Sequence, residues 1–245
     1  MQALKDLANL LYPPVCVLCR RLEPVSLSPL AGSPPFCEDC RQTMVRCQAP
    51  VCQQCGLAVA AAFDAVVKCR TCQKQPRLFT MARAPWQYIG SLQQAIHQLK
   101  YAQRWRLGNW LAEDMVRLAQ QTLPIGQIDF VSPIPSHWLR RRLRGFDPTA
   151  ILARLVADKI NKPYLPKAIT RTRWTRSQTQ LSWPKRLRNV NQAFCANKAL
   201  VNSRVILLID DVLTSGATAE SCSGALRAAG AREVFVLTAA RTPLN

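Results

Sequence analysis

The chain has 245 residues, of which 49% are hydrophobic, enough for one core and a smaller second module. It carries 33 Lys and Arg residues against 14 Asp and Glu, a formal net charge of +19 at pH 7. This excess favours polyanionic partners such as nucleic acid or pyrophosphate and says nothing about the fold. Since no apolar run approaches the ~18 residues that a membrane-spanning helix needs, we expect a cytoplasmic protein without a transmembrane segment.

The cysteines are concentrated in the first third of the chain, after residues 1–11, which have the pattern of a short amphipathic helix and not of a secretion signal. Nine of the 11 cysteines lie within residues 16–72, and eight of them form four C-x-x-C pairs. Disulfides are not expected without secretion, whereas four thiolates around Zn2+ make a closed tetrahedral site. We therefore predict two structural zinc ions in a module of residues 1–80. The predicted ligands are Cys16, Cys19, Cys37, Cys40, Cys52, Cys55, Cys69 and Cys72.

The pairing of these cysteines stays open at the level of the sequence. Consecutive C-x-x-C pairs would share an ion, or the pairs would cross, and both arrangements hold two ions. Cys47 stands outside the four pairs, and we interpret it as a small buried residue or a spare thiol. Redox chemistry at one C-x-x-C pair is the competing interpretation, which the presence of four pairs disfavours.

The chain beyond Cys72 alternates between strand and helix patterns. A linker with Gln73, Gln75 and Pro76 leads to a short apolar strand, two amphipathic helices and a second strand that ends in prolines. Asp147 and Pro148 then have the positions of a helix N-cap and of the first helical residue. The predicted ranges are a strand at 86–89, helices at 91–100 and 107–121, a strand at 128–135 and a helix from 148 to about 160.

Two basic segments lie within this α/β pattern. The first falls between a strand end and a helix start, where guanidinium groups would bind phosphate oxygens bidentately; a solvated basic loop is the alternative. Its residues are Arg140, Arg141, Arg142 and Arg144. The second segment, 168–194, is rich in glutamine and interleaves Trp174 and Trp183 with Arg173 and Arg176. We interpret it as a mobile lid or as a surface for single-stranded nucleic acid, which stacks bases on aromatic rings.

The stretch from Arg204 to Glu220 is the most informative part of the sequence. Residues 205–209 form an apolar run that predicts a strand buried on both faces of a parallel sheet. Two carboxylates, a loop of small residues and a helix from about residue 219 to Gly230 follow. Together they predict an anion site beside a pair of hydroxyl acceptors, which is what a phosphorylated sugar requires. The candidate residues are Asp210, Asp211, Thr214, Ser215, Gly216, Ala217 and Thr218.

One other interpretation of this stretch is a Walker B strand of an ATPase. It requires a P-loop elsewhere in the chain, and none of the 9 glycines is followed by lysine, so we exclude it. A final strand at residues 233–238 completes an alternating α/β pattern that starts near Trp86.

Residues 205–218 resemble the ribose-phosphate fingerprint of type I phosphoribosyltransferases at every position. With the cysteine pairs, Ser-Pro-Ile-Pro135, Arg-Gly-Phe146 and the basic segment up to Asn189, the chain resembles the ComF family of phosphoribosyltransferase-like proteins over nearly its whole length. That family usually has Val before the first proline and Gly-Phe-Asn-Gln in the second motif. Here Ser132 and Gly-Phe-Asp-Pro148 stand instead, a change that preserves the helix cap.

The resemblance implies a double zinc ribbon in residues 1–80 and an α/β domain in residues 81–245, with a type I phosphoribosyltransferase-like parallel sheet and flanking helices. Asp210 and Asp211 would hold the ribose hydroxyls of 5-phosphoribosyl 1-pyrophosphate (PRPP) and the loop its 5′-phosphate. Mg2+ and the arginines would take the pyrophosphate. Two functions follow: a phosphoribosyltransferase with an unknown acceptor, or a protein that handles single-stranded DNA in uptake or nutrition, alongside proteins of the uptake machinery. The sequence identifies no acceptor or base pocket, which favours DNA handling.

Overall fold

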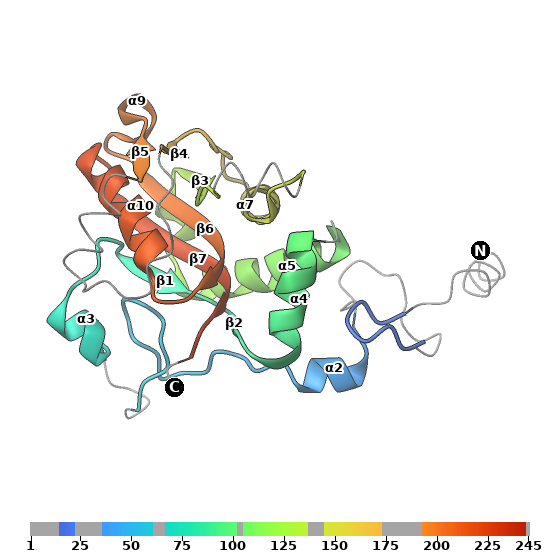
Figure 1. Cartoon of the computed structure of the whole chain (residues 1–245). Helices are drawn as coiled ribbons and strands as arrows, with labels where there is room; N and C mark the ends of the chain where they lie inside the picture. The colour runs from blue at the N-terminus through green and yellow to red at the C-terminus, as the bar shows by residue number, and fades with distance from the viewer. Residues whose placement is uncertain are drawn as a thin grey trace.

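The computed structural model describes residues 15–22, 36–60, 67–101, 105–136, 145–172 and 193–243. Its main sheet has five strands in the order β1-β7-β6-β3, and β2 pairs with β7 beyond the end of β1 (Figure 1). All of these pairings are parallel. The strands are β1 (Met81–Arg83), β2 (Trp86–Gln87), β3 (Phe130–Pro133), β6 (Val205–Leu213) and β7 (Glu233–Arg241). The predicted α/β fold with a parallel sheet is confirmed.

Strand β6 is the centre of the sheet because its residues pack on both faces. Residues 205–209 are each 0% exposed, as the continuous apolar run predicts. The strand does not end at Ile209, however, where the sequence predicted its end. Pairing with β7 continues to Leu213, so the acidic pair lies within the strand. Backbone hydrogen bonds to a neighbouring strand here outweigh the low strand propensity of aspartate.

Four longer helices cover the two faces of the sheet. On one face α5 and α7 contribute Leu111 and Leu152 to a core with Val205, Leu207 and Ile209. On the other face α10 packs against the alternate β6 residues (Figure 1). The helices are α4 (Gly90–Tyr101), α5 (Trp105–Thr122), α7 (Pro148–Lys159) and α10 (Ala217–Ala228). None of the described helices combines the length and the apolarity needed to cross a membrane.

The predicted start of α7 is confirmed in detail. Asp147 has an extended backbone, and its carboxylate accepts hydrogen bonds from the amides of Thr149 and Ala150. Pro148 occupies the first helical position, where its missing N–H costs nothing. The Asp147 carboxylate also accepts a hydrogen bond from Ser136 Oγ at 2.6 Å, so residues on either side of the arginine-rich segment are tied together.

Several short elements were not predicted from the sequence. Residues predicted as a linker contain β1 and the one-turn helix α3 (Arg70–Lys74), and the basic segment begins and ends in an antiparallel pair of strands. That pair is β4 (Ile169–Arg171) with β5 (Phe194–Ala196), and it is followed by α9 (Lys198–Val201). Elements of three to five residues are too short to show a periodic pattern, and β1 has a single buried residue, Ala82.

The cysteine-rich segments extend the sheet at its β1 and β2 edge. The amide of Gln87 donates to the carbonyl of Val45 at 2.8 Å, and the amide of Ala82 donates to the carbonyl of Gln54 at 2.7 Å. Gly56 has a positive φ of 67°, and a Cβ at this position would lie 2.6 Å from the Ala82 carbonyl oxygen. These contacts pair the backbone of an otherwise open edge.

Candidate functional site

Two carboxylates lie where β6 extends past its neighbour β3. The last pair between these strands is Pro133 with Ile209, so Asp210 is the first residue of β6 beyond β3. On the opposite side β7 accompanies β6 as far as Leu213. Ligands of parallel α/β sheets bind outside the carboxyl ends of the strands. The acidic pair therefore occupies the edge at which a ligand is expected.

The regular alternation of side chains along β6 is interrupted at this pair. Ile209 is buried in the core beneath α5 and α7, and Val212 packs against the same core. Residues three apart on a regular strand would point to opposite faces. Asp210 and Asp211 lie between Ile209 and Val212, where the alternation breaks, and both are half-buried. Asp210 Oδ1 accepts a hydrogen bond from the Asp211 amide at 2.9 Å, which fixes the two carboxylates relative to each other.

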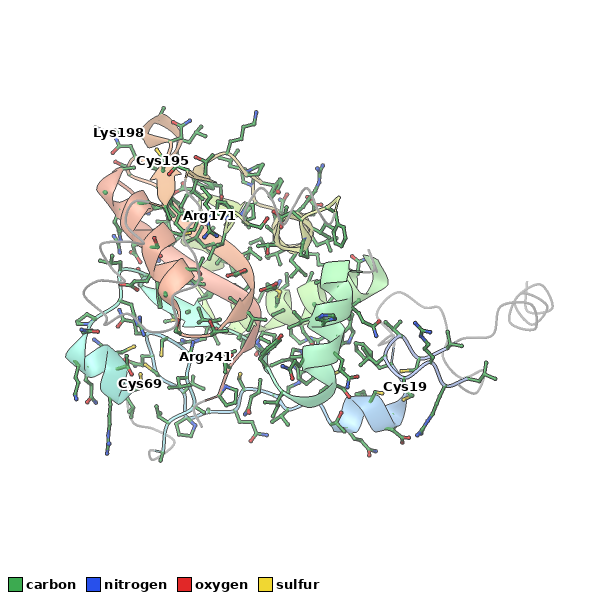
Figure 2. All side chains as sticks on the ribbon, viewed as in Figure 1. Cys19, Cys69, Arg171, Cys195, Lys198 and Arg241 are labelled. Atoms are coloured by element: carbon green, nitrogen blue, oxygen red, sulfur yellow. The ribbon has the colours of Figure 1, made fainter. Side chains whose placement is uncertain are left out.

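A buried thiol on α10 is influenced by two charges of opposite sign. Burial raises the pKa of the Cys222 thiol on α10, the negative charge of Asp210 raises it further, and the positive charge of Arg171 opposes this. Asp210 and Arg171 thus act on the same buried thiol. Arg171 comes from β4, and its guanidinium carbon lies 5.4 Å from the ring centroid of Phe194 (Figure 2). A guanidinium near the acidic edge suits a ligand that carries both hydroxyl and phosphate groups.

The loop from Thr214 to Thr218 connects the acidic edge to α10. Gly216 has a left-handed backbone with φ of 79° at the N-cap of this 12-residue helix. The Ala217 amide donates to Ser215 Oγ at 3.4 Å. Thr214, Ser215 and Thr218 are exposed, so their hydroxyls reach solvent beside the first amides of the helix. The first amides of a helix and the positive end of its dipole favour an anion at this point.

The loop and α10 are held by residues from outside the predicted site. Glu220, in the first turn of α10, is 4% exposed, and its Oε1 accepts a hydrogen bond from the Leu78 amide at 3.0 Å. Arg77 Nη2 donates to the Ser215 carbonyl at 3.5 Å. Burial raises the pKa of Glu220, while the Leu78 amide and the charge of Arg77 oppose that rise. No pattern in the sequence connects residues 77 and 78 with α10, so the sequence analysis missed this contact.

The eight predicted zinc ligands form two separate groups of four cysteines. Within each group the Sγ atoms all lie within 4.8 Å of one another. Cys19 and Cys37 have their sulfurs 3.5 Å apart, and Cys55 and Cys69 have theirs 3.6 Å apart. Sulfurs of a tetrahedral site with Zn–S bonds of ~2.3 Å lie ~3.8 Å apart, so both groups fit zinc. The first group is Cys16, Cys19, Cys37 and Cys40, and the second is Cys52, Cys55, Cys69 and Cys72. The pairing is consecutive, and the crossed alternative is excluded.

The two groups differ in burial and in their charged neighbours. Cys19 of the first group is exposed, whereas every cysteine of the second group is buried. Arg241, only 7% exposed, donates from Nη2 to Cys55 Sγ at 3.5 Å. Burial raises the pKa of the half-buried Cys47 thiol to about 11, and the charge of Arg241 opposes that rise. Cys47 belongs to neither group.

Comparison with known proteins agrees with this arrangement. The double zinc ribbon domain family matches residues 7–74. The DNA utilization protein YhgH of Escherichia coli O157:H7 is 31% identical to the chain over 240 residues, covering 95% of the chain and 99% of that protein. The chain belongs to the ComF/YhgH family. Competence protein F of Haemophilus influenzae is 27% identical over 197 residues, covering 78% of the chain and 85% of that protein. Membership confirms the resemblance found in the sequence motifs.

A more distant likeness is to a solved allosteric regulatory enzyme of purine biosynthesis. The two chains are 21% identical, with a TM-score of 0.41, and the match covers 59% of this ComF/YhgH member and 30% of that chain.

All six arginines predicted to bind anions lie outside the described residues. These are Arg140, Arg141, Arg142, Arg144, Arg173 and Arg176. The described neighbours of both segments lie near the acidic edge of this ComF/YhgH chain. Ser136 follows the end of β3, and Arg171 on β4 acts on Cys222 together with Asp210.

Proposed function

We propose that this protein binds PRPP at the carboxyl end of β6 and handles single-stranded DNA. The observation that carries the first part is the sequence of features from Asp210 to Thr218: two half-buried carboxylates, exposed hydroxyls and the start of a helix. The carboxylates would accept hydrogen bonds from the ribose 2′- and 3′-hydroxyls. The loop amides would hold the 5′-phosphate, as helix starts hold phosphates in other α/β proteins.

The pyrophosphate of PRPP would carry Mg2+, which neutralises part of its charge. The arginines at 140–144 and Arg171 would supply the remaining cations, since guanidinium groups bind phosphate oxygens bidentately. A relative supports a phosphoribosyl compound as the ligand: an amidophosphoribosyltransferase of Pasteurella multocida is 24% identical over 188 residues, covering 76% of this chain and 34% of that enzyme.

The DNA part of the proposal rests on family membership and on charge. Relatives are a DNA utilization protein and a competence protein, and the chain has a net charge of +19. Phosphate neutralisation supplies most of the non-specific affinity for nucleic acid. Trp174 and Trp183 lie among the arginines of the second basic segment, where bases would stack on them. Proteins of the DNA-uptake machinery are the partners that this role requires.

Single-stranded DNA binding should depend steeply on salt, with a log–log slope near −0.7 for each phosphate neutralised. Replacing Arg173 and Arg176 with Ala should flatten the slope by up to about 1.4, because two phosphate contacts are lost. Trp174→Ala should weaken the affinity by roughly 1–3 kcal/mol and leave the slope nearly unchanged if a base stacks there. Fluorescence anisotropy of a labelled oligonucleotide across a salt series measures both quantities.

The control removes two charges elsewhere. Arg21 and Arg41 are exposed and pair with Asp39 and Glu38 near the first cysteine group, so changing both to Ala lowers the net charge equally. Equal flattening by the two pairs would mean that charge alone attracts DNA and that the second basic segment has no special role. No binding at low salt would refute the DNA proposal for the isolated chain.

Turnover of PRPP is the second candidate function, favoured by the fingerprint at residues 205–218. An assay for Mg2+-dependent release of pyrophosphate from PRPP distinguishes an enzyme from a binding protein. Mixed nucleobases and amines are supplied as acceptors. We expect PRPP to bind without release of pyrophosphate above the background of hydrolysis. Sustained release with one acceptor would instead assign a phosphoribosyltransferase.

A further inference from the structure

The loop of residues 214–218, proposed above to hold the phosphate of PRPP, is called the PRPP loop here. A short connecting segment, residues 77–80, joins the second cysteine group to this loop. This segment follows α3, which begins directly after Cys69 and contains Cys72. Its Phe79 side chain is 1% exposed, so the segment is fixed in the core. As described above, Arg77 donates to the Ser215 carbonyl, and the Leu78 amide donates to Glu220. One segment of four residues thus contacts both the loop and the first turn of α10.

The hydrogen bond to Glu220 is costly to lose because this carboxylate is buried. Its Oε1 accepts the Leu78 amide, while its Oε2 is shielded from solvent and has no hydrogen-bond partner among the described residues. A buried carboxylate that loses a hydrogen bond is strongly destabilised. Arg227, further along α10, donates to the Leu78 carbonyl at 3.4 Å, so the segment is also held from the other end of the helix. Movement of residues 77–80 therefore moves the start of α10.

A second connection reaches the loop through β7. Arg241 is the last residue of this strand, and it pairs in register with Leu213, the residue before the loop. The amide of Thr242 donates to the Leu213 carbonyl at 3.1 Å. The Arg241 side chain meanwhile donates to Cys55. Figure 2 labels Arg241 and Cys69, another cysteine of the same group. Since a zinc ion with four thiolates has a net charge of about −2, a buried arginine offsets part of that charge and is fixed by it.

The first cysteine group contacts a different part of the molecule. Its residues pack with Met44 and Trp86 on the α4 side of the molecule, and Thr43 Oγ1 donates to Ser91 Oγ at 2.5 Å on α4. Figure 1 places α2 (Glu38–Gln42), which begins after Cys37, below α4, and places α3 on the other side of the sheet edge. No hydrogen bond identified within the described ranges links this group to residues 210–218.

We propose that zinc in the second cysteine group fixes the PRPP loop, so that this zinc and PRPP bind cooperatively, whereas zinc in the first group has no influence on PRPP. The identity of the ligand rests on the function proposed above, but the mechanical connection does not. Coupling between two ligands is reciprocal: whatever factor zinc adds to PRPP affinity, PRPP adds to the affinity for that zinc. Factors of roughly 5- to 150-fold are typical of such coupling.

The first experiment needs no ligand. Hydrogen exchange of the amides at residues 214–218 is compared between the parent, Arg77→Gln, Arg241→Gln and the control Arg21→Gln, with zinc content measured in each. The first two variants each remove one connection and should speed exchange in the loop, while Arg21→Gln breaks only the exposed pair with Asp39. Unchanged loop exchange in both connection variants would overturn the proposal.

The second experiment measures the coupling itself. The variant Cys19→Ser with Cys40→Ser keeps only the second site, and its zinc affinity is titrated against a chelator with and without saturating PRPP and Mg2+. PRPP should raise this affinity roughly 5- to 150-fold. The variant Cys55→Ser with Cys72→Ser keeps only the first site, whose affinity should not change. PRPP that binds but leaves the second-site affinity unaltered refutes the coupling. If PRPP fails to bind at all, the proposed function fails, and loop exchange in the Cys55→Ser, Cys72→Ser variant, compared with the Cys19→Ser, Cys40→Ser variant, decides whether zinc in the second group fixes the loop.

Discussion

Chelation of zinc from the intact chain should release two ions and unfold the cysteine-rich segments. Structural zinc contributes an apparent ~10–16 kcal/mol per site, which is as large as the whole net stability of a typical domain, ~5–15 kcal/mol. The described cysteine-rich segments have few buried apolar side chains of their own, among them Leu18, Phe36 and Leu57, so thiolate–metal bonds carry most of their stability. Metal analysis by mass spectrometry, followed by calorimetric melting, measures both effects.

Loss of zinc from the second group should destabilise the sheet, whereas loss of zinc from the first group should not. Emptying the second group uncovers the β1 edge, where Gln54 and Gly56 contact Ala82, so the sheet itself should lose stability. Emptying the first group should leave the melting of the sheet close to that of the parent. Cys72→Ser and Cys40→Ser test the two groups.

The matched control for these variants is Cys195→Ser, because Cys195 is exposed and belongs to neither group. Purification under reducing conditions of a metal-free chain with intramolecular disulfides would contradict the zinc assignment. Equal losses of sheet stability from Cys40→Ser and Cys72→Ser would contradict the difference between the groups. The division of the chain at residues 80 and 81 stays a prediction, and this experiment tests it.

Much of the fold was predictable because strong local patterns carried it. The apolar run at 205–209, the cap at Asp147 and the glycine stop at Gly230 each have a local physical cause, and the structure has all three. The choice between consecutive and crossed pairing of the cysteines could be made only from the structure, since both pairings satisfy the same spacing. That Asp210 and Asp211 belong to β6 also could not be predicted from the sequence. The strand is extended by pairing with β7, which begins 20 residues after β6 ends.

The contacts that hold the candidate site could not be predicted, for a different reason. Arg77 and Leu78 meet residues 215 and 220 across 138 and 142 positions of sequence. Neither belongs to a motif, and a backbone amide such as that of Leu78 leaves no signature in the side-chain pattern. The short strands β4 and β5 are similar, since three residues cannot display a period. These contacts between residues distant in sequence can be seen only in the folded structure.

Replacing Asp210 and Asp211 together with Ala should abolish PRPP binding. Each carboxylate would accept a hydrogen bond from a ribose hydroxyl, and hydrogen bonds to charged groups contribute roughly 1.5–3 kcal/mol each. Loss of both would weaken binding by about 3–6 kcal/mol, or roughly 10²- to 10⁴-fold. Titration calorimetry with PRPP and Mg2+ measures this change. Asp210→Asn with Asp211→Asn should have a smaller effect, because the amide oxygen can still accept from the residue 211 amide and from a hydroxyl.

Asp129 provides the matched control, since it precedes β3 and contacts the start of β6, at the opposite end of that strand from Asp210 and Asp211. Its Oδ2 accepts the Val205 amide at 2.7 Å, and that hydrogen bond, together with Arg204, lowers the pKa of the carboxyl group. Asp129→Asn should therefore reduce the free energy of unfolding at neutral pH while PRPP affinity stays at the parent value. A folded Asp210→Ala, Asp211→Ala protein that binds PRPP as tightly as the parent would refute the assignment of the site. If Asp129→Asn lowered PRPP affinity as strongly as the double change, the effect would belong to the stability of β6 and not to contacts with the ribose.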